Sequence, residues 1–300
     1  MPSSPSGNGR GRAAAPGGNG REGRRIEVRE VPEKEIGALW REARKTNLFP
    51  SRRLYREFFR ELGGRAFTPA DGPRQGLAIM GRWRGGSRLH CLWFISAGPG
   101  TSRELLAGAM EEYLREGEEM VTRMVDEAGA AFFEGSGFSP FQEIVLLEGD
   151  GPSMRIPAGP PPVRIRRFKA DDLEGVLSVD AAAFDRFWRV DSWSVRCISR
   201  YCLYNRCVVA EEDGGVGGYS IAGTNGYGGF IQRLAVHPRF QGRGWGGALL
   251  GNQLAWMRSL GTRVYMVNTQ RDNLAARATY LKAGFNRQAG PRYIYRYVRG

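Results

Sequence analysis

The stretch Gln241-Gly242-Arg243-Gly244-Trp245-Gly246-Gly247 places four glycines within seven residues. It follows the alternating segment GFIQRLAV, residues 229–236, and precedes the apolar segment ALLGNQLAWM from Ala248. A glycine loop between a strand and a helix lets several backbone N–H groups point at one spot, and the helix dipole adds positive partial charge there. The loop is therefore predicted to suit a pyrophosphate.

Neither common nucleotide-binding fingerprint explains this loop. It lacks the Lys-Ser/Thr pair of a P-loop, and its strand follows a hairpin and does not open a βαβ unit. The hairpin is predicted by Asp213-Gly214-Gly215, which separates the strand-like segments RCVVAEE, residues 206–212, and VGGYSIAG, residues 216–223. The loop therefore belongs to another kind of α/β unit.

The rest of this region alternates between the periods of strands and helices. The predicted order is a strand at 163–168, a helix at 173–184, the hairpin, the strand before the glycine loop, a helix at 246–260, a strand at 263–269, a helix at 273–284 and a final strand. Gly284 is predicted to end the last helix. Such an order predicts an α/β unit with a mixed, mostly antiparallel sheet flanked by helices.

Two segments of this region resemble one known family. QGRGWG, residues 241–246, is similar to the Gln/Arg-x-x-Gly-x-Gly/Ala loop of the GCN5-related N-acetyltransferases, the GNAT family. NTQRDNLAARATYLKAGF, residues 268–285, is similar to the second signature of that family, with Asn273, Tyr280 and Gly284-Phe285 in register. The resemblance covers residues 163–287, about 125 of the 300 residues. It implies an N-acetyltransferase that uses acetyl-CoA.

The resemblance also implies how acetyl-CoA, the acyl donor, would bind. In the family, the pantetheine arm pairs like an extra strand with the strand equivalent to residues 234–236, and the pyrophosphate rests on the glycine loop. No metal is implied. The residues assigned to acetyl-CoA in this way are Leu234, Ala235, Val236, Gln241, Gly242, Arg243, Gly244, Trp245, Gly246, Gly247, Asn273 and Tyr280.

Tyr280 is the residue to which the resemblance assigns catalysis, as the donor of a proton to the departing thiolate. The assignment is chemically reasonable, because an amine attacks a thioester only when it is deprotonated and the leaving sulfur needs a proton. A phenol pKa of ~10 is close enough to a thiol pKa of ~8.5 for that transfer. The alternative, a core tyrosine on a buried helix face, stays open.

No general base is assigned. Many family members carry a glutamate on the strand before the loop, whereas this strand has Phe230 and Gln232 and no carboxylate. Gln232 could order a water that relays the proton. The acidic residues that could lie near the cleft are Asp185, Asp191, Glu211 and Glu212.

The acceptor is expected to meet FDRFWRVDSW, residues 184–193, because this segment shapes the acceptor pocket in the family. Its aromatic residues could line an apolar pocket, and its aspartates could attract a cationic amine. A core of aromatic residues between helices is the equal alternative. The candidate acceptor-binding residues are Phe187, Trp188, Asp191 and Gln232.

The first half of the chain repeats the second with an offset of 147 residues. Each half opens with an alternating strand, from Ile26 or Val163, and ends with a helix that closes on Gly-Phe, at Phe138 or Phe285. The repeat predicts two tandem GNAT units, each with a mixed sheet flanked by helices.

The first copy is predicted to be degenerate. Asp126 stands in place of Asn273 and Phe133 in place of Tyr280, and the shorter loop SAGPGTSREL contains Pro99, which has no N–H. Its expected role is to support the second copy and to form one wall of the acceptor cleft. The predicted organisation is a disordered Gly/Arg-rich tail (1–25), a degenerate GNAT-like lobe (26–150), a Pro/Gly linker (151–162) and a catalytic GNAT lobe (163–300).

Composition limits the partners and the compartment. The chain has 41% hydrophobic residues and no apolar run long enough to span a membrane, so a soluble, cytoplasmic protein is expected. The net charge of +13 suits nucleic acid or a polyanionic cofactor, and because part of it lies in the tail no nucleic-acid partner is expected. Four cysteines and two histidines form no common zinc or disulfide pattern, so neither is expected.

The sequence therefore predicts an N-acetyltransferase that acts on a small-molecule or peptide amine through its second half alone. One alternative is a protein N-terminal acetyltransferase of the ribosomal type, which the second signature and the following GPRYIYRYV, residues 290–298, also resemble. Another is an acetyl-CoA-sensing regulator that binds nucleic acid through its basic tail. The presence of Tyr280 favours an enzyme.

Overall fold

The computed structural model describes residues 26–45, 49–84, 88–98, 101–156, 163–287 and 290–300. The predicted disordered tail, 1–25, and the second half of the predicted linker, 157–162, lie outside these residues. The elements of the first half are β1 (Val28–Glu30), α1 (Glu33–Ile36), η1 (Gly37–Leu39), α2 (Trp40–Lys45), α3 (Arg52–Glu61), β2 (Arg65–Pro69), β3 (Gly76–Arg82), β4 (Leu89–Ala97), α4 (Ser102–Tyr113), β5 (Glu119–Thr122), α5 (Glu127–Glu134), β6 (Ser139–Asp150) and η2 (Gly151–Ser153).

The second half follows the order that the sequence predicts, with four additional elements: the helix α7, the 3-10 helices η3 and η4, and the two-residue strand β12. Its elements are β7 (Arg164–Arg167), η3 (Ala170–Asp172), α6 (Leu173–Ala183), α7 (Ser192–Ile198), β8 (Tyr204–Glu212), β9 (Gly215–Thr224), β10 (Gly228–Val236), η4 (Pro238–Phe240), α8 (Trp245–Ser259), β11 (Val264–Gln270), α9 (Leu274–Lys282), β12 (Asn286–Arg287) and β13 (Arg292–Val298).

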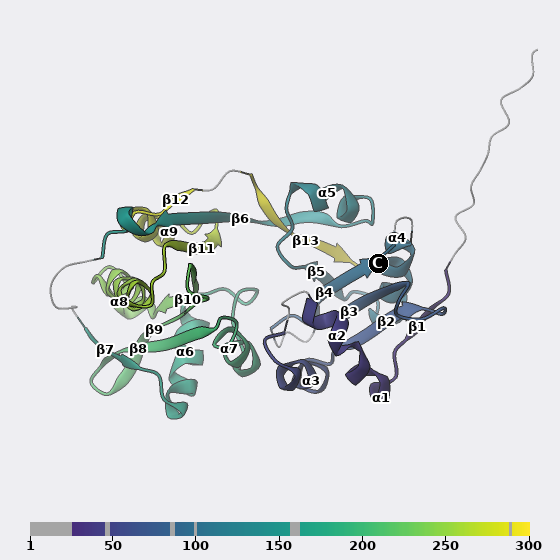
Figure 1. The fold of residues 1–300 in the computed structure, drawn as a ribbon, viewed down its shortest axis with the longest axis horizontal. Coiled ribbons are helices and arrows are strands. Elements are labelled where there is room, and N and C mark those ends of the chain that lie inside the picture. Colours follow the sequence, from purple (N-terminus) through teal and green to yellow (C-terminus); the bar gives the residue numbers. More distant parts are fainter. Residues whose placement is uncertain (1–25, 46–48, 85–87, 99–100, 157–162, 288–289) are drawn as a thin grey trace, which may run out of the picture.

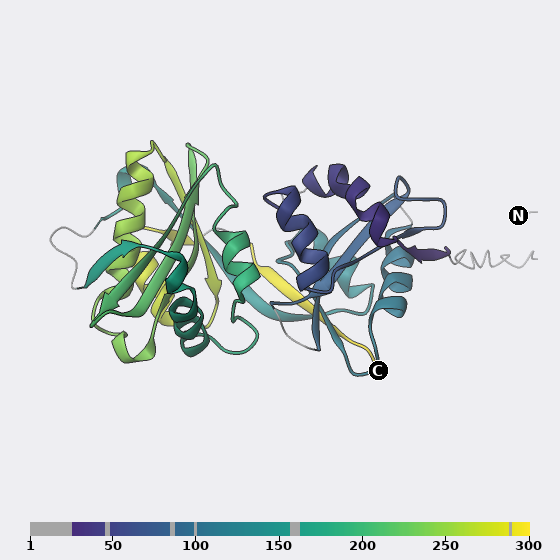
Figure 2. The same cartoon turned by 90° about the horizontal axis from the view of Figure 1, so that it is seen from below.

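The described strands form one 13-stranded sheet in the order β1-β2-β3-β4-β5-β13-β6-β11-β10-β9-β8-β7, with β12 beside β6. Most neighbours are antiparallel, whereas β4 with β5 and β10 with β11 are parallel. Helices flank the sheet in both halves (Figures 1 and 2). The predicted class, a mixed and mostly antiparallel sheet flanked by helices, is confirmed.

The two halves exchange their final strands. β6 follows the last helix of the first half, yet its residues 144–150 pair with β11 of the second half. β13 pairs with β5 of the first half and with residues 139–144 of β6. Figure 1 shows β6 passing from one half to the other. The hydrogen-bonded sheet is therefore continuous across the halves, and the domain boundary at 151–162 stays a prediction.

Side-chain alternation explains how helices cover both faces of the second-half sheet. In β9, Ile221 packs in the cluster of α6, whereas Ala222 packs in the cluster of α8. In β10 a bulge at Gln232 interrupts this alternation. Because the extra residue reverses the faces, Ile231 lies on the α8 side and Ala235 lies on the α6 side. After the bulge, the side chains of β10 therefore face the opposite side of the sheet from the one that strict alternation would give them.

The halves also share hydrophobic cores. α7 of the second half buries Trp193 and Cys197 in the cluster that contains Phe58 of α3. A second cluster joins Trp83 of the first half to Trp188 of the second. Burial of one large apolar side chain contributes about 1.5–3 kcal/mol. The first half therefore packs directly against the segment that was expected to shape the acceptor pocket.

Several local predictions are confirmed. Asp213 and Gly214 have φ values of 53° and 79°, as a two-residue type I′ hairpin requires. Gly284, with φ 97°, follows the end of α9.

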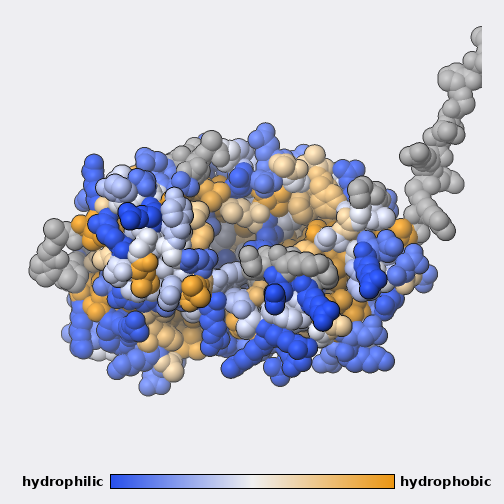
Figure 3. All heavy atoms as spheres, in the orientation of Figure 1, coloured by the Kyte–Doolittle hydropathy of each residue, from blue (hydrophilic) through white to orange (hydrophobic). Residues whose placement is uncertain are grey.

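The surface is polar along the rim of the face drawn in Figure 3, with hydrophobic residues interspersed. Within the described ranges, every helix is too short or too polar to cross a membrane. The same residues contain no group of three or more His, Cys, Asp or Glu side chains placed to hold a metal ion.

Candidate active site

β10 and β11 separate near the middle of the second-half sheet. Their parallel pairing runs from residues 228 and 264 to residues 231 and 267, although the strands continue to residues 236 and 270. The other edge of β10 stays paired with β9 as far as Val236. The main chain of residues 232–236 that faces the gap is therefore available to an extended ligand.

A cavity of about 90 Å³ lies in this gap. Side chains of β10, β11 and α9 form most of its wall, and two residues of the first half, Arg84 and Ile144, complete it. Five residues that the sequence predicted for the site meet here: Trp188, Gln232, Leu234, Asn273 and Tyr280. The other lining residues are Phe184, Ile231, Arg233, Val267, Asn268, Thr269, Gln270 and Ala276.

The glycine loop leads from β10 into α8 with an open main chain. Gly242 and Gly244 have φ values of 75° and 81°, a region that favours glycine. A Cβ at Gly242 or Gly247 would meet no protein atom within 4 Å. α8 begins at Trp245 without a side-chain cap, so the N–H groups of its first turn are free to bind an anion.

The side chains of the loop also contact the protein, although only Trp245 is buried. Trp245 is buried and stacks on Phe240, with ring centroids 4.4 Å apart. Gln241 donates from Nε2 to the carbonyl of Val236 at 3.0 Å, which ties the loop to the end of β10. Arg243 has its guanidinium carbon 5.7 Å from the centre of the Phe240 ring. The loop therefore offers its main-chain groups and the exposed guanidinium of Arg243 to a ligand.

Tyr280 lies on α9 and lines the cavity with 5% of its surface exposed. Burial raises the pKa of Tyr280 to about 12, although nearby Arg233 opposes the shift. The phenol therefore keeps its proton at neutral pH and can donate it. Tyr280 is both a buried helix residue and a cavity residue, so its catalytic role stays a prediction.

Asn273 lies at the start of α9, beside the same cavity. Its side-chain oxygen caps the helix by accepting from the N–H of Ala276 at 3.1 Å. The cap uses the carbonyl oxygen of the amide and leaves its NH₂ group for the cavity that Asn273 lines. Asn273 can therefore cap α9 and donate to a ligand at the same time.

Gln232, the bulged residue of β10, carries a buried acceptor without a donor. Its Nε2 lies 3.7 Å from Sγ of Cys202. Its Oε1 is buried and has no hydrogen-bond partner within the part of the chain that the structure describes. An unpaired buried acceptor costs about 1–3 kcal/mol unless a ligand or water donates to it. The atom marks a place where a donor of a bound molecule fits.

A buried ion pair that the sequence analysis missed lies beside the cavity. Asp180 of α6 is fully buried and lies 2.7 Å from the Arg233 guanidinium. It also accepts from the hydroxyl of Tyr219 at 2.5 Å and from the N–H of Val190 at 2.9 Å. Arg233 donates in turn to the carbonyl of Trp188 at 2.8 Å. The Asp180–Arg233 pair thus holds β10 at its bulge against residues 184–193, the segment that was expected to shape the acceptor pocket.

The aspartates of the expected acceptor segment bind main-chain N–H groups. Asp185 accepts from Phe187 at 2.9 Å and from Trp188 at 3.2 Å. Asp191 caps α7 by accepting from Ser194 at 2.7 Å. Attraction of a cationic amine by Asp191, and acceptor contact by Phe187, stay predictions, since neither residue lines the cavity.

No carboxylate lines the cavity among the described residues. Glu211 forms ion pairs with Arg164 and Arg166 on β7. Glu212 is exposed at the end of β8, next to the hairpin. The sequence assigned no base, and the geometry offers Gln232 as the one predicted relay residue in the cavity.

In the first half, β4 and β5 separate as β10 and β11 do in the second, but the side chains beside the gap differ. β4 and β5 pair in parallel only from residues 89 and 119 to residues 92 and 122, and a pocket follows that includes Asp126 and Phe133. Asp126 caps α5 by accepting from Gly129 at 3.1 Å, just as Asn273 caps α9. Phe133 has no hydroxyl, and Asp126 adds a negative charge.

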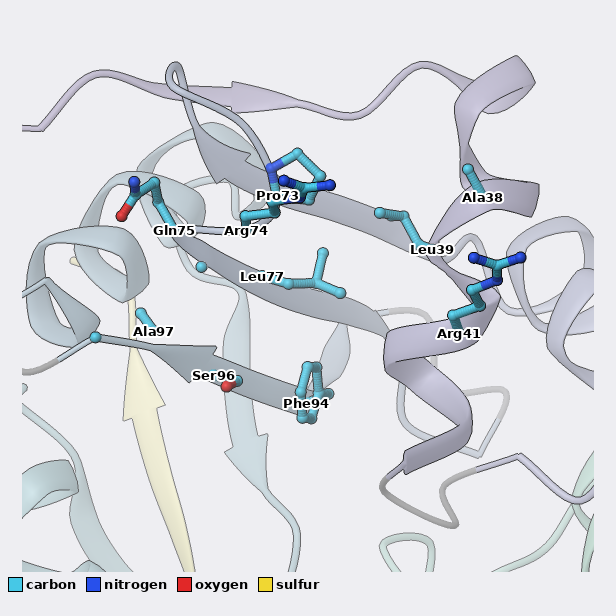
Figure 4. Close-up of a pocket in the computed structure, with 12 residues that line it drawn as sticks. Ala38, Leu39, Arg41, Pro73, Arg74, Gln75, Leu77, Phe94, Ser96 and Ala97 are labelled. Atoms are coloured by element: carbon cyan, nitrogen blue, oxygen red, sulfur yellow. The ribbon is translucent and has the colours of Figure 1, made fainter.

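A larger hollow in the first half lies between α2, β3 and β4 (Figure 4). Arg41 comes from α2 and Arg74 precedes β3, while Leu77 and Phe94 come from the strands. Both arginine side chains are exposed. The guanidinium groups of Arg41 and Arg74 are therefore solvated. No tyrosine is among the described residues that line this hollow.

Comparison with known sequences agrees with this geometry. The profile of the family described as "Acetyltransferase (GNAT) family" matches residues 178–285, which include β10, the glycine loop, β11 and α9. An uncharacterised N-acetyltransferase of Methanocaldococcus jannaschii is 30% identical over 132 residues, which are 43% of this chain and 82% of that protein.

Solved structures resemble the whole chain. A tandem GNAT protein from the clavulanic acid biosynthesis pathway has a TM-score of 0.66 at 17% identity and covers 92% of this chain and 99% of its own. A GCN5-related N-acetyltransferase from Sphaerobacter thermophilus has a TM-score of 0.55 at 15% identity and covers 92% of this chain and 96% of its own. At these identities the likeness concerns the fold, and the predicted tandem arrangement is confirmed.

Proposed function

Because the chain belongs to the GNAT family of N-acetyltransferases, we propose that it transfers an acetyl group from acetyl-CoA to a primary amine of a small molecule or peptide. Only the second-half site is active in this proposal. The observation that carries it is the meeting of Tyr280 with the open edge of β10 in one cavity. The glycine loop adjoins that cavity, since a Cβ at Gly246 would lie 4.0 Å from Leu234, a lining residue.

The fit to acetyl-CoA is supported by main-chain groups that lack partners. The edge of residues 232–236 suits an extended amide-containing arm, which can pair with it as another strand would. The first turn of α8 suits a pyrophosphate, because its N–H groups and the helix dipole both favour negative charge. The two features follow each other along the chain, as one long ligand requires.

The chemistry that bound acetyl-CoA supplies is a thioester carbonyl, which a free amine can attack directly. Tyr280 holds a proton on its hydroxyl at neutral pH, because burial raises its pKa to about 12. That proton is available to a sulfur that becomes negative as it leaves. Oε1 of Gln232 can accept a hydrogen bond from the acceptor amine or from a water beside it.

The restriction to the second half is supported by the first-half pocket. Phe133 cannot donate a proton there, and the carboxylate of Asp126 would repel the anionic donor. Pro99, in the counterpart of the glycine loop, lies outside the described residues, but its missing N–H follows from the sequence.

Calorimetric titration of acetyl-CoA into the wild type and the Gly247→Glu variant tests the proposal. A Cβ at Gly247 would have no neighbour within 4 Å outside its own helix backbone, and an acid in the first turn of a helix stabilises it by about 0.3–1 kcal/mol, so the variant should fold. Its carboxylate should weaken acetyl-CoA binding by about 100-fold or more through like-charge repulsion.

The matched control is Ala170→Glu, which adds the same charge at the exposed start of η3, ahead of α6. The control should bind acetyl-CoA as the wild type does. If the wild type does not bind acetyl-CoA, the proposed function is wrong. If Gly247→Glu binds as tightly as the control, the glycine loop is not the pyrophosphate site.

A further inference from the structure

Arg84 is a residue of the first half that lines the cavity of the second half. It lies two residues beyond the end of β3 and has a φ of 45°, in the left-handed region that a non-glycine residue seldom adopts. Such a conformation costs about 1–3 kcal/mol and persists only where the surroundings impose it. Here the surroundings direct a cation toward the cavity.

Contacts from both halves hold the Arg84 side chain in place. It donates to the carbonyl of Trp188 at 2.6 Å, and its guanidinium carbon lies 4.6 Å from the centre of the Trp83 ring and 5.3 Å from that of Trp188. Trp83 donates from Nε1 to the carbonyl of Phe187 at 2.7 Å. Trp83 and Arg84 thus hold the turn against residues 187–188. Among the described residues Arg84 donates one hydrogen bond, so most of its five guanidinium N–H groups have no described partner.

The charges around the cavity do not balance. Arg233 donates to the same Trp188 carbonyl as Arg84, so the two guanidiniums converge on one oxygen. Asp180 forms its ion pair with Arg233, and no described carboxylate bonds to Arg84. Burial and the charge of Arg233 lower the pKa of Arg84 to about 9, yet Arg84 stays protonated at neutral pH. Asp180 and Asp191 attract Arg84 from a distance, but no described carboxylate forms a direct ion pair with it, so its guanidinium suits an anionic ligand.

We propose that Arg84 binds an anionic group, a carboxylate or a phosphate, on the acceptor amine. The inference rests on the proposed function and narrows its acceptor to primary amines that carry such a group, as amino acids and phosphoamines do. Arg84 binds the anion bidentately with its free donors, while Oε1 of Gln232, in the same cavity, accepts from the amine. The first half thereby determines the specificity of a site whose reacting groups lie in the second.

The acceptor, and not acetyl-CoA, is the ligand that reaches Arg84. The phosphate-binding features lie in the glycine loop beyond the end of β10, whereas Arg84 contacts Trp188 in the segment expected to shape the acceptor pocket. The exposed Arg41 and Arg74 of the first-half hollow (Figure 4) form the competing anion site. Neither arginine is among the described residues that line the Tyr280 cavity, so they serve as the control.

The test compares kcat and KM for matched pairs of amines that differ only by the anionic group. Suitable pairs are 4-aminobutyrate with butylamine, α-amino acids with their amides, and O-phosphoethanolamine with ethanolamine. The wild type should prefer the anionic member of at least one pair, and the carboxylate and phosphate arms show which anion fits. Arg84→Gln should lower kcat/KM for the anionic member about 10- to 100-fold, through KM, and change the neutral member less than about 3-fold.

Two further variants keep the outcome interpretable. Arg74→Gln removes a cation of the same half outside the cavity and should leave both members of each pair unchanged. Arg84→Gly removes the charge and accepts the left-handed φ without strain, so it should lose the preference for anions even if Arg84→Gln folds poorly. Acetyl-CoA affinity of every variant, measured by calorimetry, should match the wild type.

The outcomes separate the inference from the proposed function. A wild type that does not bind acetyl-CoA overturns the proposed function and the inference with it. A wild type that binds acetyl-CoA but acetylates neutral amines as well as anionic ones overturns only the role of Arg84. The same holds if the Arg84 variants slow both members of a pair equally, because that result indicates a purely structural role, or if Arg74→Gln alone removes the preference.

Discussion

Replacement of Asp180 by alanine should strongly destabilise the protein, because it leaves Arg233 charged and buried. Asp180 is fully buried and accepts hydrogen bonds from Arg233, Tyr219 and Val190. The Arg233 side chain is only 9% exposed. Loss of one partner of such a pair removes the attraction but not the cost of keeping the other charge out of water.

The magnitude follows from the groups that lose a partner. A buried charge left alone costs about 3–5 kcal/mol, and a buried donor left unpaired costs about 1–3 kcal/mol. Because Tyr219 and Val190 can relax in part, we expect Asp180→Ala to lower the free energy of unfolding by at least about 3 kcal/mol. That is a large part of the ~5–15 kcal/mol typical of native proteins.

A double-mutant cycle with Arg233→Met isolates the cause. Methionine removes the cation and fills part of its volume, so the double variant should be less destabilised than the sum of the single variants by about 2 kcal/mol. Urea unfolding followed by tryptophan fluorescence and circular dichroism gives the four free energies. The reasoning is wrong if Asp180→Ala lowers the free energy of unfolding by less than about 1 kcal/mol. It is also wrong if the effects of the two single substitutions add up to that of the double variant, because the carboxylate would then not be stabilising the buried charge.

Three further outcomes are expected. Tyr280→Phe should lower kcat about 100-fold or more with unchanged acetyl-CoA affinity, and because burial raises the pKa of Tyr280 to about 12, the wild-type rate should show no loss from its ionisation below about pH 10. Asp172→Asn should flatten the acid dependence of stability: the hydrogen bond from Arg166 lowers the pKa of Asp172, so its contribution is present above the unfolded pKa of ~3.9 and is lost in acid melts as pH falls through the lower folded value. Gly284→Ala should cost about 2 kcal/mol or more in thermal unfolding, since its φ is 97° and a Cβ would lie 2.6 Å from the carbonyl oxygen of Ser153.

Structural features that depend on residues close together in the sequence could be predicted from it. The hairpin at Asp213-Gly214, the glycine loop and the helix caps depend on glycine conformations and short polar side chains, which act over a few residues. The exchange of β6 and β13 depends on which distant strand each one meets. An alternating pattern specifies which face of a strand is buried, but main-chain hydrogen bonds do not specify its partner. The sequence therefore predicted the strands of the second half but not the exchange of β6 and β13.

The residues of the candidate site also fall into those that the sequence can locate and those that it cannot. Tyr280 and Asn273 lie at fixed distances from the glycine loop, so the spacing of the signatures locates them. Asp180 could have been noticed, because it follows Val176 by four residues and so falls on the buried stripe of its helix, where a carboxylate needs a partner. Arg84 gives no such signal. Its sequence context, Arg84-Gly85-Gly86, indicates a turn, and its contacts lie 104 residues further along the chain.

The first half, which is predicted to be degenerate, contributes a strand and cavity residues to the second half. Phe133, which stands where the second half has Tyr280, packs its ring on Phe138 and Tyr295. β6 covers an edge of β11 that would otherwise expose unpaired main-chain groups, and the same strand brings Ile144 to the cavity. A strand exchange of this kind holds the first half at a fixed place beside the second. Under the proposed role of Arg84, a residue of the first half acts on a ligand of the second half, and the unit that selects the acceptor is then the whole tandem chain.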